Sequence, residues 1–277
     1  MAITVPRSAV PILDSLWRAS EMGTPASFTT PSGHPGLDAE LPGGGWPAGQ
    51  LSEVLQTQAG RHEWRLLLPA VRAAAASGTV VLIGCPHWPN MAALAGQGIP
   101  LSRVLVVEAE RPADRLWAAE QALRCRELAA LLVWLPQVRA EQLRRLQFAS
   151  QAARQARPPL AFVFRPLSAR QEASPAPLRL GLQLAPQAIG GTALPGLEID
   201  IFKRRGPQLA APLHIHTAMP PVMALKALRA AGQPAAMPAA SVPAPVVPVP
   251  DNVVTLPTAF NGPPHVVDRT LPIAASA

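Results

Sequence analysis

Residues 33–64 read GHPGLDAELPGGGWPAGQLSEVLQTQAGRHEW: a glycine-rich lead-in, a short apolar run from Leu51 to Leu55, and a turn that enters a helical pattern. At this place nucleotide-binding α/β domains carry the phosphate loop G-x-x-x-x-G-K-[ST]. That loop needs glycines so that backbone N–H groups surround the phosphates, a lysine for the β- and γ-phosphates, and a hydroxyl for Mg²⁺. The residues after Leu55 therefore determine whether the domain can use a nucleotide.

The turn lacks each group that phosphate-loop chemistry requires. In register with the motif, the first glycine position is taken by Gln56, the second by Arg61, the lysine position by His62 and the hydroxyl position by Glu63, with Gly60 just before them. A carboxylate beside a triphosphate would repel it. The sequence therefore predicts a degenerate loop and no nucleotide or other cofactor.

The remaining catalytic groups are missing as well. The lead-in resembles that of RecA-type recombinases, in which the next strand ends in a glutamate that activates water and a later strand delivers a metal-coordinating aspartate. Here Pro86 stands at or beside the first position, and the apolar run at 131–135 (LLVWL) contains no carboxylate. Without lysine, hydroxyl, base and metal ligand there is no route to phosphoryl transfer. We therefore expect a non-catalytic domain.

Composition is consistent with a folded α/β protein. The 277 residues are 49% hydrophobic and 15% charged, enough for one sizeable core. No run reaches the roughly 18 apolar residues of a membrane span, so we expect a cytoplasmic protein without membrane contact. Cys85 and Cys125 are read as core thiols and not as a zinc site. His214 and His216 alternate along an expected strand, as a surface pair or, alternatively, a metal pair.

The chain divides into three parts. Residues 1–31 contain an amphipathic helix at 9–21 and a linker. Residues 32–218 alternate strands and helices, which predicts a mostly parallel sheet flanked by helices. Residues 219–277 contain a short helix at 221–231 and a Pro/Ala/Val-rich tail that we expect to be disordered. The tail is either a spacer or a docking arm that uses the apolar islands 253–256 and 259–260.

The expected elements of the middle part follow from their apolar periods. Buried strands are predicted at 51–55, 79–84, 103–107, 131–135 and 160–165, and helices at 61–76, 90–96, 113–126 and 140–155. After residue 165 the period changes to two, which predicts a terminal antiparallel hairpin from 178–184 and 197–203 and a further strand within 212–217.

Net charge is +7, which suggests an anionic partner. The candidate DNA- or partner-binding residues are Arg144, Arg145, Arg154 and Arg157 on or after the helix at 140–155, and Lys203, Arg204 and Arg205 after the hairpin. On that helix the predicted polar face holds residues 144, 147, 151, 154 and 155, without an aromatic side chain to stack on bases. Weak, sequence-independent DNA contact is one reading, and a surface helix whose arginine stems cover the core is the other.

Several stretches give the chain a family resemblance. They are residues 32–38 (SGHPGLD), 41–49 (LPGGGWPAG), 66–70 (LLLPA), the basic helix and 196–206 (GLEIDIFKRRG). Over most of 33–217 the chain resembles the ImuA family, RecA-like accessory proteins of bacterial translesion DNA synthesis. The resemblance implies a RecA-like fold and a bridging role in the SOS response. It implies as partners a Y-family polymerase homologue, an error-prone C-family DNA polymerase and RecA itself.

The middle of the chain also resembles a second family. Residues 49–168 resemble SulA, the SOS-induced inhibitor of bacterial cell division, through 104–107 (VLVV), 121–124 (QALR) and 164–169 (FRPLSA). Such inhibitors are shorter and lack the glycine-rich lead-in, the hairpin with Lys203 and the long tail. An enzyme is the third class, but no serine or cysteine lies in a nucleophile turn such as G-x-S-x-G.

Overall fold

The computed structural model describes residues 28–152, 157–185, 196–215 and 253–255. Its centre is a nine-stranded sheet in the order β10-β9-β8-β3-β7-β6-β4-β5-β11. The strands are β3 (Leu51–Gln56), β4 (Thr79–Ile83), β5 (Val104–Glu108), β6 (Leu128–Trp134), β7 (Leu160–Pro166), β8 (Leu178–Leu184), β9 (Leu197–Lys203), β10 (Leu213–Ile215) and β11 (Val253–Thr255). All neighbours are parallel except β8 with β9 and β9 with β10.

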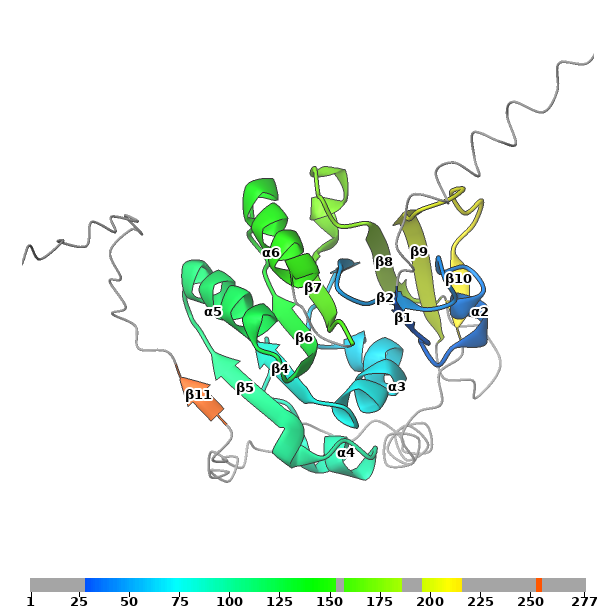
Figure 1. Cartoon of the computed structure of the whole chain (residues 1–277). Coiled ribbons are helices and arrows are strands. Elements are labelled where there is room, and N and C mark those ends of the chain that lie inside the picture. The colour runs from blue at the N-terminus through cyan, green and yellow to red at the C-terminus, as the bar shows by residue number, and fades with distance from the viewer. Residues whose placement is uncertain (1–27, 153–156, 186–195, 216–252, 256–277) are drawn as a thin grey trace, which may run out of the picture.

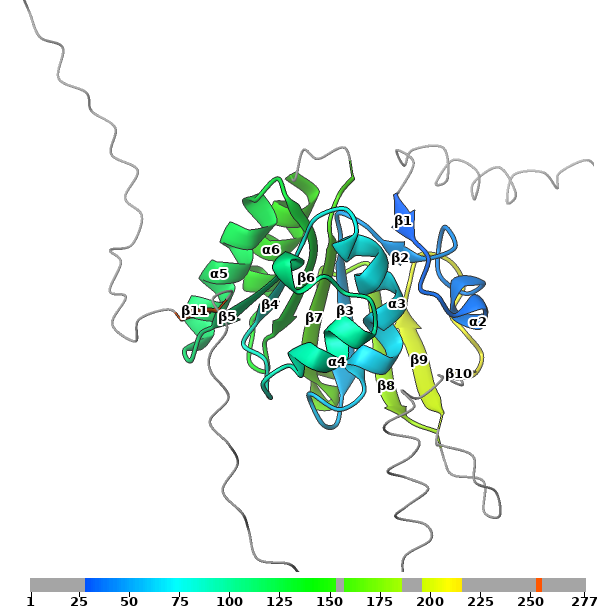
Figure 2. The same cartoon turned by 90° about the horizontal axis from the view of Figure 1, so that it is seen from below.

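Helices cover both faces of this sheet. They are α2 (Pro35–Asp38), α3 (Glu63–Ala75), α4 (Met91–Gly96), α5 (Pro112–Arg124) and α6 (Ala140–Ala152), with the 3-10 turns η1 (Leu101–Arg103) and η2 (Leu167–Gln171). Figures 1 and 2 show α5 and α6 side by side on one face and α3 and α4 on the other. Two buried clusters correspond to these faces, one containing Leu66 and Leu94 and the other Leu116 and Leu143.

Continuous apolar runs form the central strands because both of their faces are covered. Strand β3 lies between β7 and β8, with Val54 opposite Phe164 on one side and Leu180 on the other. Its six residues are all buried. The predicted α/β class, the mostly parallel sheet and the terminal hairpin are therefore confirmed, and the third strand of the hairpin is β10.

The glycine-rich lead-in packs against α3. Gly33 has φ +82°, and a Cβ at this position would lie 2.4 Å from the Cβ of Pro69. The Nε2 atom of His34 lies 3.1 Å from the carbonyl oxygen of Leu66. A two-stranded sheet of β1 (Thr29–Thr30) and β2 (Trp46–Pro47) then brings the chain to β3. The close approach of Pro69 explains the glycine at position 33.

The outer parts of the chain are only partly covered by the structure. The helices expected at 9–21 and 221–231 lie outside the described residues. Within the tail, Val253–Thr255 form β11 and pair with β5, which differs from the expectation of a tail without ordered structure. In the described part of the chain, no helix has the length and apolarity needed to cross a membrane.

Candidate functional site

The degenerate loop lies at the carboxyl ends of β3, β4 and β6, where parallel α/β sheets bind their ligands. It connects the last residue of β3, Gln56, with the first residue of α3, Glu63. Gly60 allows the turn, since its φ is +82° and a Cβ there would lie 2.5 Å from the ring of His87. The loop is thus packed tightly against the turn that follows β4.

The carboxylate of Glu63 fills the centre of this loop. Glu63 is 1% exposed. Its Oε1 accepts hydrogen bonds from the Gly60 N–H at 2.5 Å, from Gln56 Nε2 at 2.5 Å and from the Trp134 indole at 3.0 Å, and its Oε2 accepts one from the His62 N–H at 2.9 Å. Backbone N–H groups of this turn, which in a working loop would surround phosphate, are here bonded to an anion that belongs to the protein.

Trp134 is the residue that the sequence reasoning did not assign. It ends β6, the strand that would deliver the metal-coordinating aspartate in the recombinases, and is 4% exposed. Its ring stacks on Phe164 with centroids 4.5 Å apart, which orients the indole N–H toward Glu63. A tryptophan at the end of an apolar strand was visible in the sequence, but its hydrogen-bond partner was not.

Two cavities adjoin the turn after β4. One, of about 170 Å³, is lined by Gly60, the side chains of the 85–90 turn, Trp64 and Trp134. The other, of about 440 Å³, lies at the ends of β4 and β5 and includes Glu108, Glu110 and Arg115. Burial raises the pKa of the Cys85 thiol to about 12, so Cys85 is not a nucleophile at neutral pH. Cys125 is exposed, so the prediction that both thiols lie in the core was wrong for Cys125. No group of three or more potential metal ligands occurs among the described residues.

The pKa of His62, at the lysine position of the motif, is lowered in the fold. Burial lowers its pKa from 6.5, and the charge of Arg65 lowers it further, against a smaller opposite effect of Glu63. Its Nδ1 is buried without a hydrogen-bond partner. Arg61, at the second glycine position, is exposed and donates to Gln58 Oε1 at 2.6 Å. Neither side chain offers a cation aimed into the loop, which the carboxylate already fills.

The exposed face of the basic helix α6 differs in part from the predicted one, since Gln151 is exposed as predicted but Gln147 is not. Arg144 and Arg145 are exposed as expected, but Gln147 is 7% exposed and accepts a hydrogen bond from the Leu51 N–H at 2.9 Å. Phe148 is 62% exposed in its place. The predictions that Gln147 lies on the outer face and that this face lacks an aromatic residue were therefore wrong.

Helix α5 extends this outer surface. Arg145 forms an ion pair with Glu120 of α5 at 2.9 Å, which joins the two helices side by side. One turn before Glu120, Trp117 is 41% exposed, and one turn after it Arg124 is exposed. We call Trp117, Arg124, Arg144, Arg145 and Phe148 the α5–α6 face. It combines two large apolar side chains with three cations, a composition that is enriched at protein interfaces.

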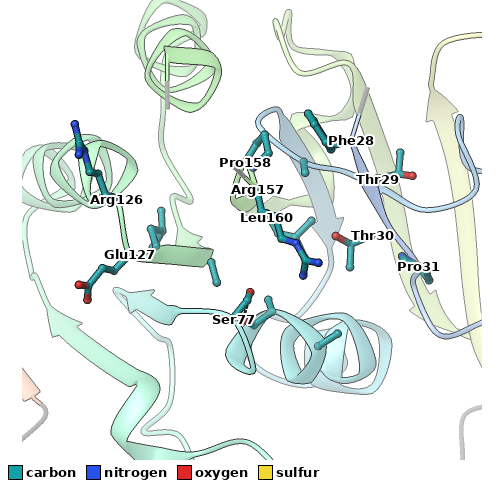
Figure 3. A pocket seen from close by; sticks show the side chains of 15 residues that line it. Phe28, Thr29, Thr30, Pro31, Ser77, Arg126, Glu127, Arg157, Pro158 and Leu160 are labelled. Carbon is teal, nitrogen blue, oxygen red and sulfur yellow. Dashed lines mark hydrogen bonds between the residues drawn. The ribbon is translucent and has the colours of Figure 1, made fainter. Parts of the chain in front are cut away.

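The other arginines near α6 are less informative. Arg154 lies outside the described residues. Arg157 is exposed three residues before β7 and lines an 800 Å³ pocket at the amino ends of the parallel strands, away from the loop. Figure 3 shows Arg157 near Thr30 on one side of this pocket and Arg126 with Glu127 on the other. Arg126 and Arg157 lie on opposite sides of this pocket, and none of the residues of the degenerate loop lines it.

The cluster after the hairpin is mostly engaged within the fold. Lys203 Nζ donates to the Ser174 carbonyl at 2.7 Å, and burial, followed by the charge of Arg179, lowers its pKa. Arg204 bonds to the carbonyl and carboxylate of Glu40. Arg205 remains exposed. Since β9 lies beyond β8 and β3 from the strands under α6, the predicted basic residues do not form one continuous patch.

The sequence reasoning also missed a buried charge cluster beneath η2. Glu53 of β3 is fully buried and pairs with Arg179 at 3.0 Å and with Arg165 at 3.6 Å. Arg179 also donates to the Ala169 carbonyl at 2.9 Å. These bonds fix the segment after β7 to the sheet, which is a structural role. A glutamate inside an apolar strand run was the available signal.

The comparisons with known proteins give a partial likeness. No family model matches the chain. The cell division inhibitor SulA of Edwardsiella piscicida is 33% identical over 72 residues, which are 26% of this chain and 43% of that protein. The chain therefore matches less than half the length of this curated relative. A solved structure of SulA from Pseudomonas aeruginosa aligns at 23% identity with a TM-score of 0.35, covering 43% of this chain and 98% of the other. A weak sequence similarity to SulA over part of the chain is what these comparisons establish.

Proposed function

We propose that this protein is a non-catalytic, RecA-like scaffold of the bacterial SOS response, which works through protein contacts and not through nucleotide turnover. The observation that carries the proposal is the Glu63 carboxylate inside the phosphate loop. A nucleotide would have to displace a buried carboxylate held by four hydrogen bonds, and would still find no lysine or hydroxyl.

The first candidate role is that of an ImuA-like accessory protein in translesion DNA synthesis. It rests on the resemblance of the lead-in, the degenerate loop and the segment 196–206. The partners would be a Y-family polymerase homologue and an error-prone C-family polymerase, with RecA as a further one. The α5–α6 face supplies a surface for such a partner, because Trp117 and Phe148 expose apolar area beside arginines. Exposed arginines there favour a partner surface that carries carboxylates.

The second candidate role is that of an SOS inhibitor of cell division. The similarity to SulA over 72 residues favours it. In this role the partner would be the division filament protein. Both candidate roles use a non-catalytic domain, so the identity of the bound partner is the observation that distinguishes them.

Two measurements on the full chain test the proposal. Calorimetric titration with Mg²⁺-ATP should show no binding at micromolar concentrations, and binding there would refute the scaffold reading. Affinity purification of the tagged chain from DNA-damaged cells should then recover the Y-family homologue for the first role or the division filament protein for the second.

The surface is tested with a matched pair of variants. Arg144→Ala with Phe148→Ala should abolish recovery of the partner, because both side chains lie on the α5–α6 face. Arg72→Ala with Phe28→Ala removes one exposed arginine and one exposed phenylalanine elsewhere and should leave recovery unchanged. Equal recovery by both variants would place the docking surface outside α5 and α6.

A further inference from the structure

The outer edge of β5 carries a strand from a distant part of the chain. In β11, Val253 pairs with Val106, Val254 with Val107 and Thr255 with Glu108, all in parallel register. Figure 1 shows β11 beside β5 at one margin of the molecule. Without β11, β5 would present a row of open backbone groups, which is a template for association with other chains.

The direction of the open groups follows from the pairing with β4. The Gly84 N–H donates to the Val107 carbonyl at 3.1 Å, so the backbone groups of Val107 point toward β4. Successive residues of a strand alternate in direction, and the N–H groups of Val106 and Glu108 therefore point outward to β11. Two specific amides thus report whether the edge is occupied.

The sequence around β11 suits strand pairing. Pro250 and Pro257, which cannot donate to a ladder, bound a proline-free window of six residues, 251–256 (DNVVTL). The residues that form β11 are β-branched, which favours an extended strand.

The covalent connection is long enough for pairing within one molecule. Strands β10 and β11 are at opposite margins of the sheet, about 38 Å apart at about 4.8 Å per strand spacing. A chain of the length of 216–252 reaches up to about 120 Å when extended. Three residue pairs with Val254 still 46% exposed form a weak contact between separate molecules, but a tether raises the effective concentration to roughly millimolar.

We infer that the outer edge of β5 is a strand-addition site for an extended, β-branched peptide, and that residues 253–255 of the same chain fill it as a detachable cover. The strand ends beside Glu108, which also lines the 440 Å³ cavity at the ends of β4 and β5. Release of the cover therefore exposes the edge of β5 beside that cavity.

Amide exchange measured by NMR on the full chain tests this inference. In the parent chain the Val106 and Glu108 amides should be protected. Val254→Pro should speed their exchange by about tenfold or more, because it removes a donor and bends the strand, while the inward amides of Leu105 and Val107 stay protected and show that the domain is folded. Val246→Pro, a matched change in the tail outside β11, should behave like the parent.

Two further outcomes decide between occupants. A synthetic peptide of residues 250–258, added at millimolar concentration to the Val254→Pro chain, should restore protection of Val106 and Glu108. Unchanged exchange in the Val254→Pro chain, or no restoration by the peptide, would overturn the inference. Protection in the parent chain that rises with concentration together with a dimer in sedimentation would assign the edge to the tail of a second copy and overturn the intramolecular cover.

Discussion

Replacing Glu63 with alanine should destabilise the whole domain although no ligand is involved. The substitution leaves four donors without an acceptor: the side chains of Gln56 and Trp134, both buried, and the N–H groups of Gly60 and His62, which water can reach in part. A buried donor left unpaired costs about 1–3 kcal/mol, and two of the four donors are buried side chains. We therefore expect Glu63→Ala to lower the free energy of unfolding by about 2–6 kcal/mol.

Urea denaturation followed by circular dichroism measures this loss. The matched control is Glu141→Ala, which removes an exposed glutamate from the first turn of α6, a helix of the same 13-residue length as α3. It should cost below about 1 kcal/mol, the usual value of a charge near a helix N-terminus. If Glu63→Ala cost no more than this control, the carboxylate would not be holding the loop together.

Added phosphate shows whether Glu63→Ala destabilises the domain through the loss of an anion or only through the loss of packing. The alanine variant leaves N–H groups pointing at an empty place beside the start of α3, an arrangement that binds anions. Inorganic phosphate at tens of millimolar should therefore raise the melting temperature of Glu63→Ala more than that of the parent or of Glu141→Ala. An equal rise in all three chains would mean that the donors do not form an anion site.

Iodoacetamide at pH 8 should modify the exposed Cys125 and leave Cys85 unmodified until the chain is denatured, because burial raises the pKa of Cys85 to about 12; mass spectrometry of both states checks this. Folding lowers the pKa of His62, so below about pH 6.5 the unfolded chain takes up a proton more readily than the folded chain. The free energy of unfolding should therefore decline as the pH falls from about 6.5 toward the folded pKa. Melting curves between pH 7.5 and 5.5 should show a smaller decline for His62→Gln. Any affinity for single-stranded DNA should fall steeply with salt, and Arg144→Ala should reduce the slope of log affinity against log salt by about 0.7; a slope of zero in the parent would contradict phosphate contact.

The sheet could be predicted from the sequence because its strands are marked by long apolar runs. The runs at 79–84 and 160–165 correspond to β4 and β7 within one residue at each end. The change to period two also located the hairpin of β8 and β9. These patterns record burial on one or both faces of a strand, and burial is what periodicity measures.

Specific hydrogen bonds could not be predicted in the same way. On α6 the alternation of polar residues placed Gln147 outward, whereas its amide oxygen is required inside by the Leu51 N–H at the start of β3. With Gln147 on the inner side of α6, the next residue, Phe148, lies on the solvent side. Similarly, the motif register identified Glu63 as a residue that excludes phosphate, but not as the acceptor for the Trp134 indole, which lies 71 positions later in the sequence.

The closed loop has a consequence for how such a domain could be regulated. When phosphate holds a loop in place, the occupancy of the ligand can change the conformation of the surrounding segments. Here the anion is the side chain of Glu63, which is covalently attached and does not dissociate. Under the proposed function the loop therefore keeps one state at every nucleotide concentration. A change of state must then come from elements held less firmly. Among the described residues the three-residue strand β11 is such an element, since it pairs with β5 alone and Val254 remains 46% exposed, whereas β5 also pairs with β4.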